Sequence, residues 1–219
     1  MDRRKALQEY QSAGAKVLGV LPGRYPRELP AALGLAHMEL WDPPVEPVTS
    51  TRHLQPFVCS VVQRSLEQIL KSTEKVDAYL YPHLCDSVQN LFTIVRDCIG
   101  DSRPAHLFYP PRNGADGQIA ADYLAGHLRE LAIALGESLG LEAADDEMVR
   151  AVRDGQRAND ALAALYRARA EGGIAPSNAE FYGLVRQGEY RPLEVAADLW
   201  ENSLTTLVEG PKGIPIVLS

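Results

Sequence analysis

The chain has 219 residues, of which 46% are hydrophobic and 23% charged, a balance typical of a globular protein with one large domain or little more. Its formal net charge of −7 argues against a nucleic-acid partner, because such proteins concentrate an excess of Lys and Arg. Neither a secretory leader nor a run of about 18 apolar residues is found, and the three cysteines are an odd, sparse set, so we expect a cytoplasmic protein with reduced thiols and no membrane contact.

Helices and strands are predicted to alternate in the first half of the chain. Residues 2–15 have a polar helical pattern, and apolar, β-favouring runs predict strands at residues 16–21, 37–41, 76–81 and 105–109. Helices are predicted between the strands, at residues 26–33, 61–73 and 86–99. This alternation favours right-handed crossovers, and therefore an α/β fold with a Rossmann-like, mostly parallel four-stranded sheet and flanking helices.

The second half is predicted to be helical. Its helical periods cover residues 118–140, 145–169, 178–186 and 192–209. We therefore expect an α/β domain at residues 1–113, followed by an all-helical extension at residues 114–210 that packs on it. Residues 213–219 have a strand pattern with no helix after it, so we interpret residues 211–219 as the first strand of a second α/β domain that this chain lacks.

Cys59 and Cys85 occupy equivalent positions, because each comes one residue before a predicted helix start. The residues that follow them have capping-box spacing: Ser60 with Gln63, and Asp86 with Gln89. The positive end of a helix dipole attracts negative charge, and cysteine binds metal as the thiolate, so both positions suit a metal ligand. Ligands of parallel sheets bind at the carboxyl ends of the strands, where both cysteines are expected.

Other interpretations of these residues remain open. A free cysteine is most often a small buried apolar residue, and Cys59 and Cys85 fit that interpretation as well. His83 lies two residues before Cys85, but a turn histidine hydrogen-bonded to backbone is the more ordinary interpretation. Cys98 shares a helix face with Leu91 and Val95 and lies roughly 20 Å along the helix from Cys85, so we expect it to be a core residue and not a third ligand.

Known motifs for other chemistries are not found in the sequence. There is no glycine-rich nucleotide-binding loop of either common type, no H-E-x-x-H and no G-x-S-x-G.

Several segments carry a resemblance to a known family. In chain order they are Gly14-Ala-Lys-Val-Leu-Gly19, Tyr25-Pro-Arg-Glu-Leu29, Ala31-Ala-Leu-Gly34, Phe57-Val-Cys-Ser60 and Asp77-Ala-Tyr-Leu-Tyr-Pro-His-Leu-Cys-Asp-Ser87. The similarity continues at Tyr123, Leu131, Gly140, Asn159, Arg169 and Glu180 and reaches the closing Ile-Val-Leu-Ser. Together these segments resemble the 2-hydroxyacyl-CoA dehydratase D-component family, which includes benzoyl-CoA reductase subunits.

The resemblance implies two Rossmann-like domains that hold a [4Fe-4S] cluster between them through three cysteines. Two of these ligands match Cys59 and Cys85. The residues expected to surround these ligands without binding the cluster themselves are Ser60, His83, Asp86 and Ser87. The third ligand would belong to the second domain, so this chain alone is expected to be incomplete.

The resemblance also implies a reaction and partners. The reaction is elimination of water from a 2-hydroxyacyl-CoA through a ketyl radical, a lyase reaction of anaerobic metabolism. It requires a homologous partner subunit, in a heterodimer or homodimer, and an ATP-dependent iron–sulfur activator protein that supplies one electron. A benzoyl-CoA reductase-type subunit would instead reduce an aromatic acyl-CoA. The alternative from another class is a non-catalytic α/β scaffold or assembly partner without a cluster.

Overall fold

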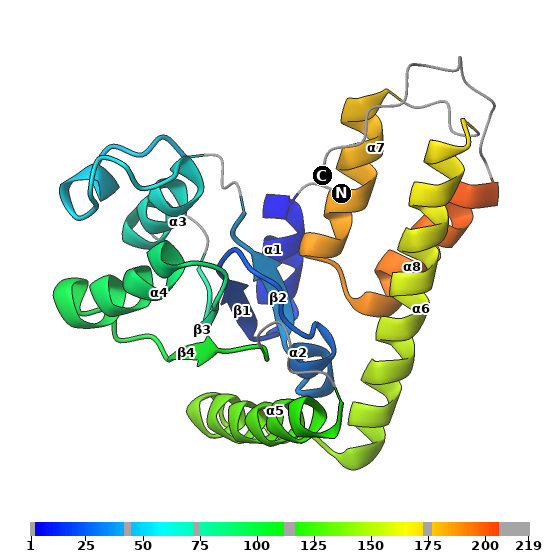
Figure 1. Ribbon diagram of the computed structural model, residues 1–219, viewed down its shortest axis with the longest axis horizontal. Coiled ribbons are helices and arrows are strands. Elements are labelled where there is room, and N and C mark those ends of the chain that lie inside the picture. Colours follow the sequence, from blue (N-terminus) through cyan, green and yellow to red (C-terminus); the bar gives the residue numbers. More distant parts are fainter. Residues whose placement is uncertain (1–2, 42–44, 72–74, 112–116, 173–176, 206–219) are drawn as a thin grey trace.

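The computed structural model describes residues 3–41, 45–71, 75–111, 117–172 and 177–205 (Figure 1). Within them, four strands form one sheet: β1 (Val17–Val20), β2 (Ala36–Glu39), β3 (Ala78–Pro82) and β4 (Ala105–Phe108). The strand order is β2-β1-β3-β4, and each neighbouring pair is parallel. The predicted four-stranded parallel sheet is therefore confirmed.

The helices also lie where the sequence predicts them. The first half contains α1 (Arg3–Ser12), α2 (Glu28–Ala32), the 3-10 turn η1 (Ser50–Arg52), α3 (Ser60–Lys71) and α4 (Asp86–Thr93), which continues as the π-helix η2 (Ile94–Ile99). The second half contains α5 (Gln118–Leu139), α6 (Asp145–Ala170), α7 (Asn178–Val185), the 3-10 turn η3 (Arg186–Glu189) and α8 (Leu193–Thr205). The strand expected at residues 211–219 lies outside the described residues.

Both faces of the sheet are covered, which explains why its strands are apolar without a polar alternation. On β3, Tyr79 and Tyr81 pack with α1, α3 and α4, whereas Ala78 and Leu80 pack with α2 and α5. Figure 1 shows α3 and α4 together on one side, with α5 below the sheet. Because these helices connect parallel strands, α3 and α4 begin at the edge where the strands end.

A third apolar cluster holds α6, α7 and α8 together. Ala158 and Ala161 of α6 and Ala196 and Ala197 of α8 are buried, and such small side chains let two helices approach closely. Trp200 fills the space beside them and donates its indole N–H to the Leu184 carbonyl at 3.1 Å. Helix α6 also contacts α2, and this contact connects the helical region to the sheet.

The prediction that Cys98 is a core residue is wrong, because Cys98 is exposed. That prediction assumed a regular α-helix, but residues 94–99 form a π-helix, whose i→i+5 hydrogen bonds widen the turn. The wider turn brings Ile99 against the core in place of Cys98. The helix then ends at Gly100, directly after the predicted range of residues 86–99, with a φ of 74° in the left-handed region that glycine favours.

Candidate functional site

Cys59 and Cys85 lie at the starts of two neighbouring helices. Cys59 directly precedes α3, and Cys85 directly precedes α4, three residues after the end of β3. The two helices contact each other and pack on the same face of the sheet (Figure 1). Both thiols are free and exposed, so the interpretation of these cysteines as buried apolar residues is wrong.

The capping boxes predicted beside the cysteines are not what starts these helices. Ser60 and Asp86 are the first helical residues, and Cys85 itself is the N-cap of α4, with extended backbone and no side-chain capping bond. The side chains of the two glutamines instead bind the preceding loops. Gln63 donates to the Val58 carbonyl at 2.8 Å, and the side-chain oxygen of Gln89 lies within hydrogen-bond distance of Nε2 of His83.

The residues beside the two cysteines are open to solvent. Ser60 and Asp86 are exposed, and Ser87 is half-buried. The carboxylate of Asp86 lies in the first turn of α4, where the helix dipole favours a negative charge. Across all the described ranges, no group of three or more His, Cys, Asp or Glu residues is arranged to hold a metal ion. The chain thus offers two cysteine donors and, within those ranges, no complete ligand set.

A buried carboxylate fixes the loop that leads to Cys59. Glu67 of α3 accepts hydrogen bonds from the backbone N–H groups of Ser50 at 2.7 Å and Val48 at 3.0 Å, and it pairs with Lys71 at 2.9 Å. Burial alone raises the pKa of a carboxyl group, but the bond from Ser50 and the Lys71 ammonium together lower the pKa of Glu67 to about 2. The role of Glu67 was not predicted, although a glutamate next to Leu66 on an apolar helix face was a signal for it.

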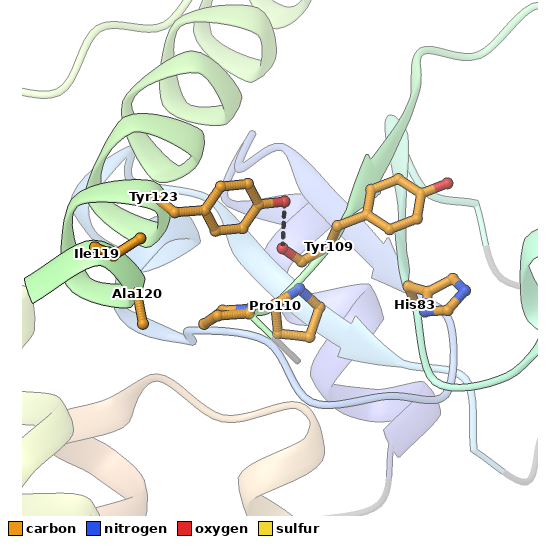
Figure 2. Close-up of a pocket in the computed structure, with 7 residues that line it drawn as sticks. His83, Tyr109, Pro110, Ile119, Ala120 and Tyr123 are labelled. Atoms are coloured by element: carbon orange, nitrogen blue, oxygen red, sulfur yellow. Dashed lines mark hydrogen bonds between the residues drawn. The ribbon is translucent and has the colours of Figure 1, made fainter. Parts of the chain in front are cut away.

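A pocket of about 400 Å³ opens beside the Cys85 turn (Figure 2). Its lining comes from the ends of β3 and β4 and the first turns of α5: His83, Tyr109, Pro110, Pro111, Ile119, Ala120 and Tyr123. The ring of His83 stacks on Tyr109 at 5.1 Å, and its Nε2 lies 2.9 Å from the Gln89 side-chain oxygen. His83 therefore bonds to a side chain through its ring, while its own backbone N–H donates to the Phe108 carbonyl.

The other side of the pocket is set by α5. Tyr123 donates to the Tyr109 carbonyl at 3.4 Å, as Figure 2 shows. His127, one turn further along α5, accepts the Tyr109 backbone N–H at 3.1 Å. The ring of His127 also stacks on Phe108 and Tyr123. This pocket was not predicted from the sequence, although the spacing of Tyr123 and His127, four residues apart, puts them on one helix face.

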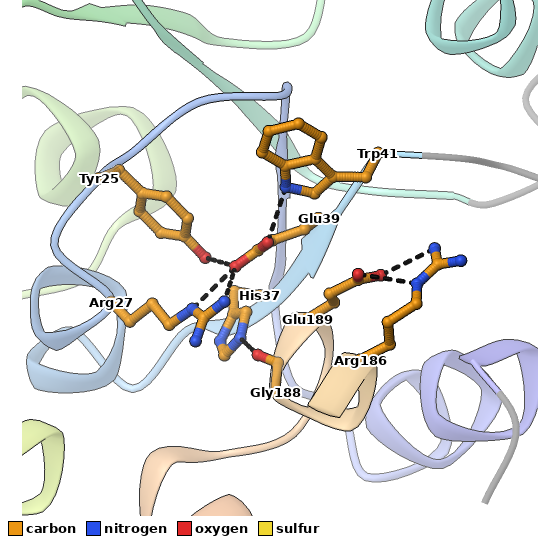
Figure 3. Close-up of polar contacts among 8 residues, drawn as sticks. All are labelled: Tyr25, Arg27, His37, Glu39, Trp41, Arg186, Gly188 and Glu189. Carbon is orange, nitrogen blue, oxygen red and sulfur yellow. Dashed lines mark hydrogen bonds and ion pairs between the residues drawn. The ribbon is translucent and has the colours of Figure 1, made fainter. Parts of the chain in front are cut away.

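A second polar cluster surrounds Glu39 at the end of β2 (Figure 3). Its carboxylate accepts hydrogen bonds from Tyr25 at 3.2 Å and Trp41 at 3.0 Å, and it forms an ion pair with Arg27 at 2.7 Å. Burial, together with the charge of Glu39, raises the pKa of Tyr25 well above its usual value. Tyr25 and Arg27 lie in the segment before α2, and Glu39 belongs to β2. Their bonds therefore connect that segment to the sheet.

The same strand connects the sheet to the helical region. His37 of β2 is buried, and its Nε2 lies 3.0 Å from the carbonyl of Gly188 in η3. Burial lowers the pKa of His37, so the neutral ring is favoured.

Among the helices that the structure describes, none has the length and apolar character that a membrane span requires.

Comparisons with known proteins agree with the expected family. Residues 23–215 match the family described as 2-hydroxyglutaryl-CoA dehydratase, D-component. The beta subunit of (R)-2-hydroxyglutaryl-CoA dehydratase from Acidaminococcus fermentans is 30% identical over 133 residues, which are 57% of this chain and 35% of that protein. A benzoyl-CoA reductase subunit of Thauera aromatica is 23% identical over 197 residues, 89% of this chain and 50% of that protein. The chain thus spans half or less of the length of these relatives, and it belongs to the 2-hydroxyglutaryl-CoA dehydratase D-component family.

Proposed function

We propose that the chain forms the part of an acyl-CoA dehydratase subunit that supplies two cysteine ligands to a [4Fe-4S] cluster. The observation that carries this proposal is the placement of Cys59 and Cys85. Both are exposed and free, and both precede neighbouring helices at the edge of the sheet where ligands bind. Family membership supports the reaction class, which is elimination of water from a 2-hydroxyacyl-CoA.

The donor set fits such a cluster in part. Cysteine thiolates are its usual protein ligands, and Cys59 and Cys85 would hold it here. The remaining ligand would belong to the second domain that the family resemblance implies, because the described residues offer no third donor beside these two. When bound, the cluster would supply electron transfer and an iron that polarises a substrate oxygen.

The chain's own residues would position this chemistry. The first backbone N–H groups of α3 and α4 have no partner within their helices and lie beside the two cysteines, where they offset negative charge. Glu67 keeps the loop before Cys59 in place through its bonds to Val48 and Ser50. The pocket beside His83 would take the acyl part of the substrate, since its proline and aromatic walls exclude water from an apolar group.

A second candidate is reduction of an aromatic acyl-CoA. Two observations favour it: the match to the benzoyl-CoA reductase protein covers 89% of the chain, and the pocket is lined by the rings of His83, Tyr109 and Tyr123. In both proposals the partners are an acyl-CoA, a homologous subunit and an ATP-dependent iron–sulfur activator, and the compartment is the cytoplasm.

Anaerobic reconstitution tests the proposal. The purified chain is incubated with iron and sulfide under nitrogen, and bound iron, bound sulfide and visible absorption are measured. We expect weak binding by the wild type and its loss in Cys59→Ala and Cys85→Ala, because each removes one of two thiolate ligands. Cys98→Ala is the matched control, since it removes an exposed thiol from the end of the same helical segment that Cys85 begins. Equal iron in Cys85→Ala and the wild type would contradict the proposal and favour the scaffold alternative.

A further inference from the structure

Helix α6 carries an exposed stripe along its length of 26 residues. Val149 is 59% exposed, Val152 55% and Tyr166 43%, although all three are large apolar or aromatic residues. They belong to a series of exposed residues spaced alternately three and four apart, here called the α6 seam: Val149, Val152, Gln156, Asn159, Ala163 and Tyr166. This spacing is that of the contact positions of a coiled coil.

Most of the seam faces away from the helices that pack on α6. At its end, the ring of Tyr166 also lies edge-on to Phe181 of α7, with the ring centroids 5.4 Å apart. The side of α6 that contacts α8 and α2 is marked by a different set of residues, Ala151, Gly155, Ala158, Ala161 and Leu165, which are buried. On a helical wheel at 3.6 residues per turn, the centre of the seam lies roughly 120° from the centre of that set. Figure 1 shows α6 running along one side of the molecule. Because Tyr166 stays 43% exposed beside α7, a helix of another molecule can lie along the seam.

The order of residues in the seam suits an antiparallel copy of itself. With the twofold axis between Arg157 and Ala158, every seam residue has a partner from the second copy. The resulting layers are Val149 with Tyr166, Val152 with Ala163, and Gln156 with Asn159, each formed twice. Apolar pairs thus lie outside and amide pairs lie near the axis. Amides at such central positions hydrogen-bond to each other and fix the register of the helices.

The charges beside the seam point to the same arrangement. Exposed residues of alternating sign recur every seven positions along one border of the seam: Asp146, Arg153, Asp160 and Arg167. In the antiparallel register above, Asp146 lies two residues, or about 3 Å, from the level of Arg167 of the second copy, and Arg153 lies equally close to the level of Asp160, so these side chains can pair. All four pairs across the interface then have opposite charge. A parallel copy would instead place like charges at the same level.

We propose that α6 is a self-association surface on which a second copy of this chain packs antiparallel. The periodicity, the apolar exposure and the charge order are three separate observations that agree on one twofold arrangement. A contact along one helix, about 39 Å long, is smaller than a standard stable interface, so the dimer should have a dissociation constant in the micromolar range. The cysteine edge is not used, so this surface is independent of the proposed function.

Sedimentation velocity of the full chain under reducing conditions tests this surface. At about 100 μM we expect the wild type to be mostly dimeric if the dissociation constant is near 10 μM. Arg153→Glu and Asp160→Arg each turn two attractive contacts into repulsive ones, so each should weaken the dimer at least tenfold. A mixture of these two variants should restore association, because the glutamate introduced at position 153 of one chain then meets the arginine introduced at position 160 of the other.

Matched controls separate this effect from misfolding and from general charge. Arg150→Glu makes the same charge change on the same helix, but outside the seam where Arg150 pairs with Glu147, and it should leave the dimer intact. Far-UV circular dichroism should show unchanged helix content in all variants. A monomeric wild type, single variants that associate as strongly as the wild type, or a mixture that stays monomeric would each overturn the proposal. Association only when a different subunit is added would overturn it as well, and would assign the seam to that partner.

Discussion

Glu67 offers the sharpest test of how the cysteine edge is held in place. Glu67→Gln keeps the size of the side chain and an acceptor oxygen for Ser50 and Val48, but removes the charge. A hydrogen bond to a charged acceptor contributes about 1 kcal/mol more than a neutral one, and two such bonds are affected. The ion pair with the partly exposed Lys71 adds less than about 1 kcal/mol. The free energy of unfolding at pH 7 should therefore fall by about 2–3 kcal/mol.

The pH dependence gives an independent measure of the same interaction. The pKa of Glu67 is lowered in the folded protein to about 2, from an ordinary value of 4.5. A lowered pKa means that the stabilisation is fully present above about pH 4.5 and is lost as the pH falls toward 2. Urea unfolding followed by circular dichroism between pH 7 and pH 3 should show this loss in the wild type and a smaller one in Glu67→Gln.

A control in the same loop separates the buried carboxylate from surface charge. Glu46→Gln makes the same substitution at a side chain that is 82% exposed, with Arg64 3.7 Å away. It should change the free energy of unfolding by less than about 0.5 kcal/mol. If Glu67→Gln were no more destabilising than Glu46→Gln, or kept the full acid dependence of the wild type, the anchoring of this loop by Glu67 would be refuted.

Three further substitutions test the packing, each by urea unfolding. Tyr81→Phe should raise the free energy of unfolding by about 1 kcal/mol, because the Tyr81 hydroxyl is buried without a hydrogen-bond partner among the described residues; a decrease would contradict this. Ser177→Ala should lower it by about 1 kcal/mol through loss of the capping box with Glu180, whereas Ser177→Asp should retain most of it. Gly188→Ala should lower it by about 1–3 kcal/mol, since a Cβ there would come within 2.7 Å of the Trp200 ring; an unchanged value would show that the ring can move aside.

The strands and helices could be predicted because their signals are local. Each strand is a short β-favouring run that ends near proline or glycine, and the helices follow an apolar period that a single sequence displays. Gly100 and Gly140 both end helices with positive φ, as their positions predict. The same local signal placed Cys59 and Cys85 directly before helices, which is where the structure has them.

The errors occur where a short-range rule competes with another interaction. Capping-box spacing beside the cysteines predicted bonds to backbone, but Gln89 reaches the ring of His83 across the turn instead. The face assigned to Cys98 depended on a regular helical period, and a single π-helical turn changes which residue returns to the core. Neither competing interaction has a signature in residue spacing, so the pattern alone could not reveal it.

The pocket wall shows why contacts between distant parts of the chain could not be predicted from the sequence. Tyr109 at the end of β4 is positioned by His83 from β3 and by Tyr123 and His127 from α5, which are 14 to 26 residues away along the chain. Each of these residues has an ordinary local role, in a turn, at a strand end or on a helix face. Only the parallel order of β3 and β4 brings the His83 turn beside the start of α5. Because Cys85 follows His83 by two residues, the strand order that places His83 in the pocket wall also fixes where the chain enters α4 at Cys85.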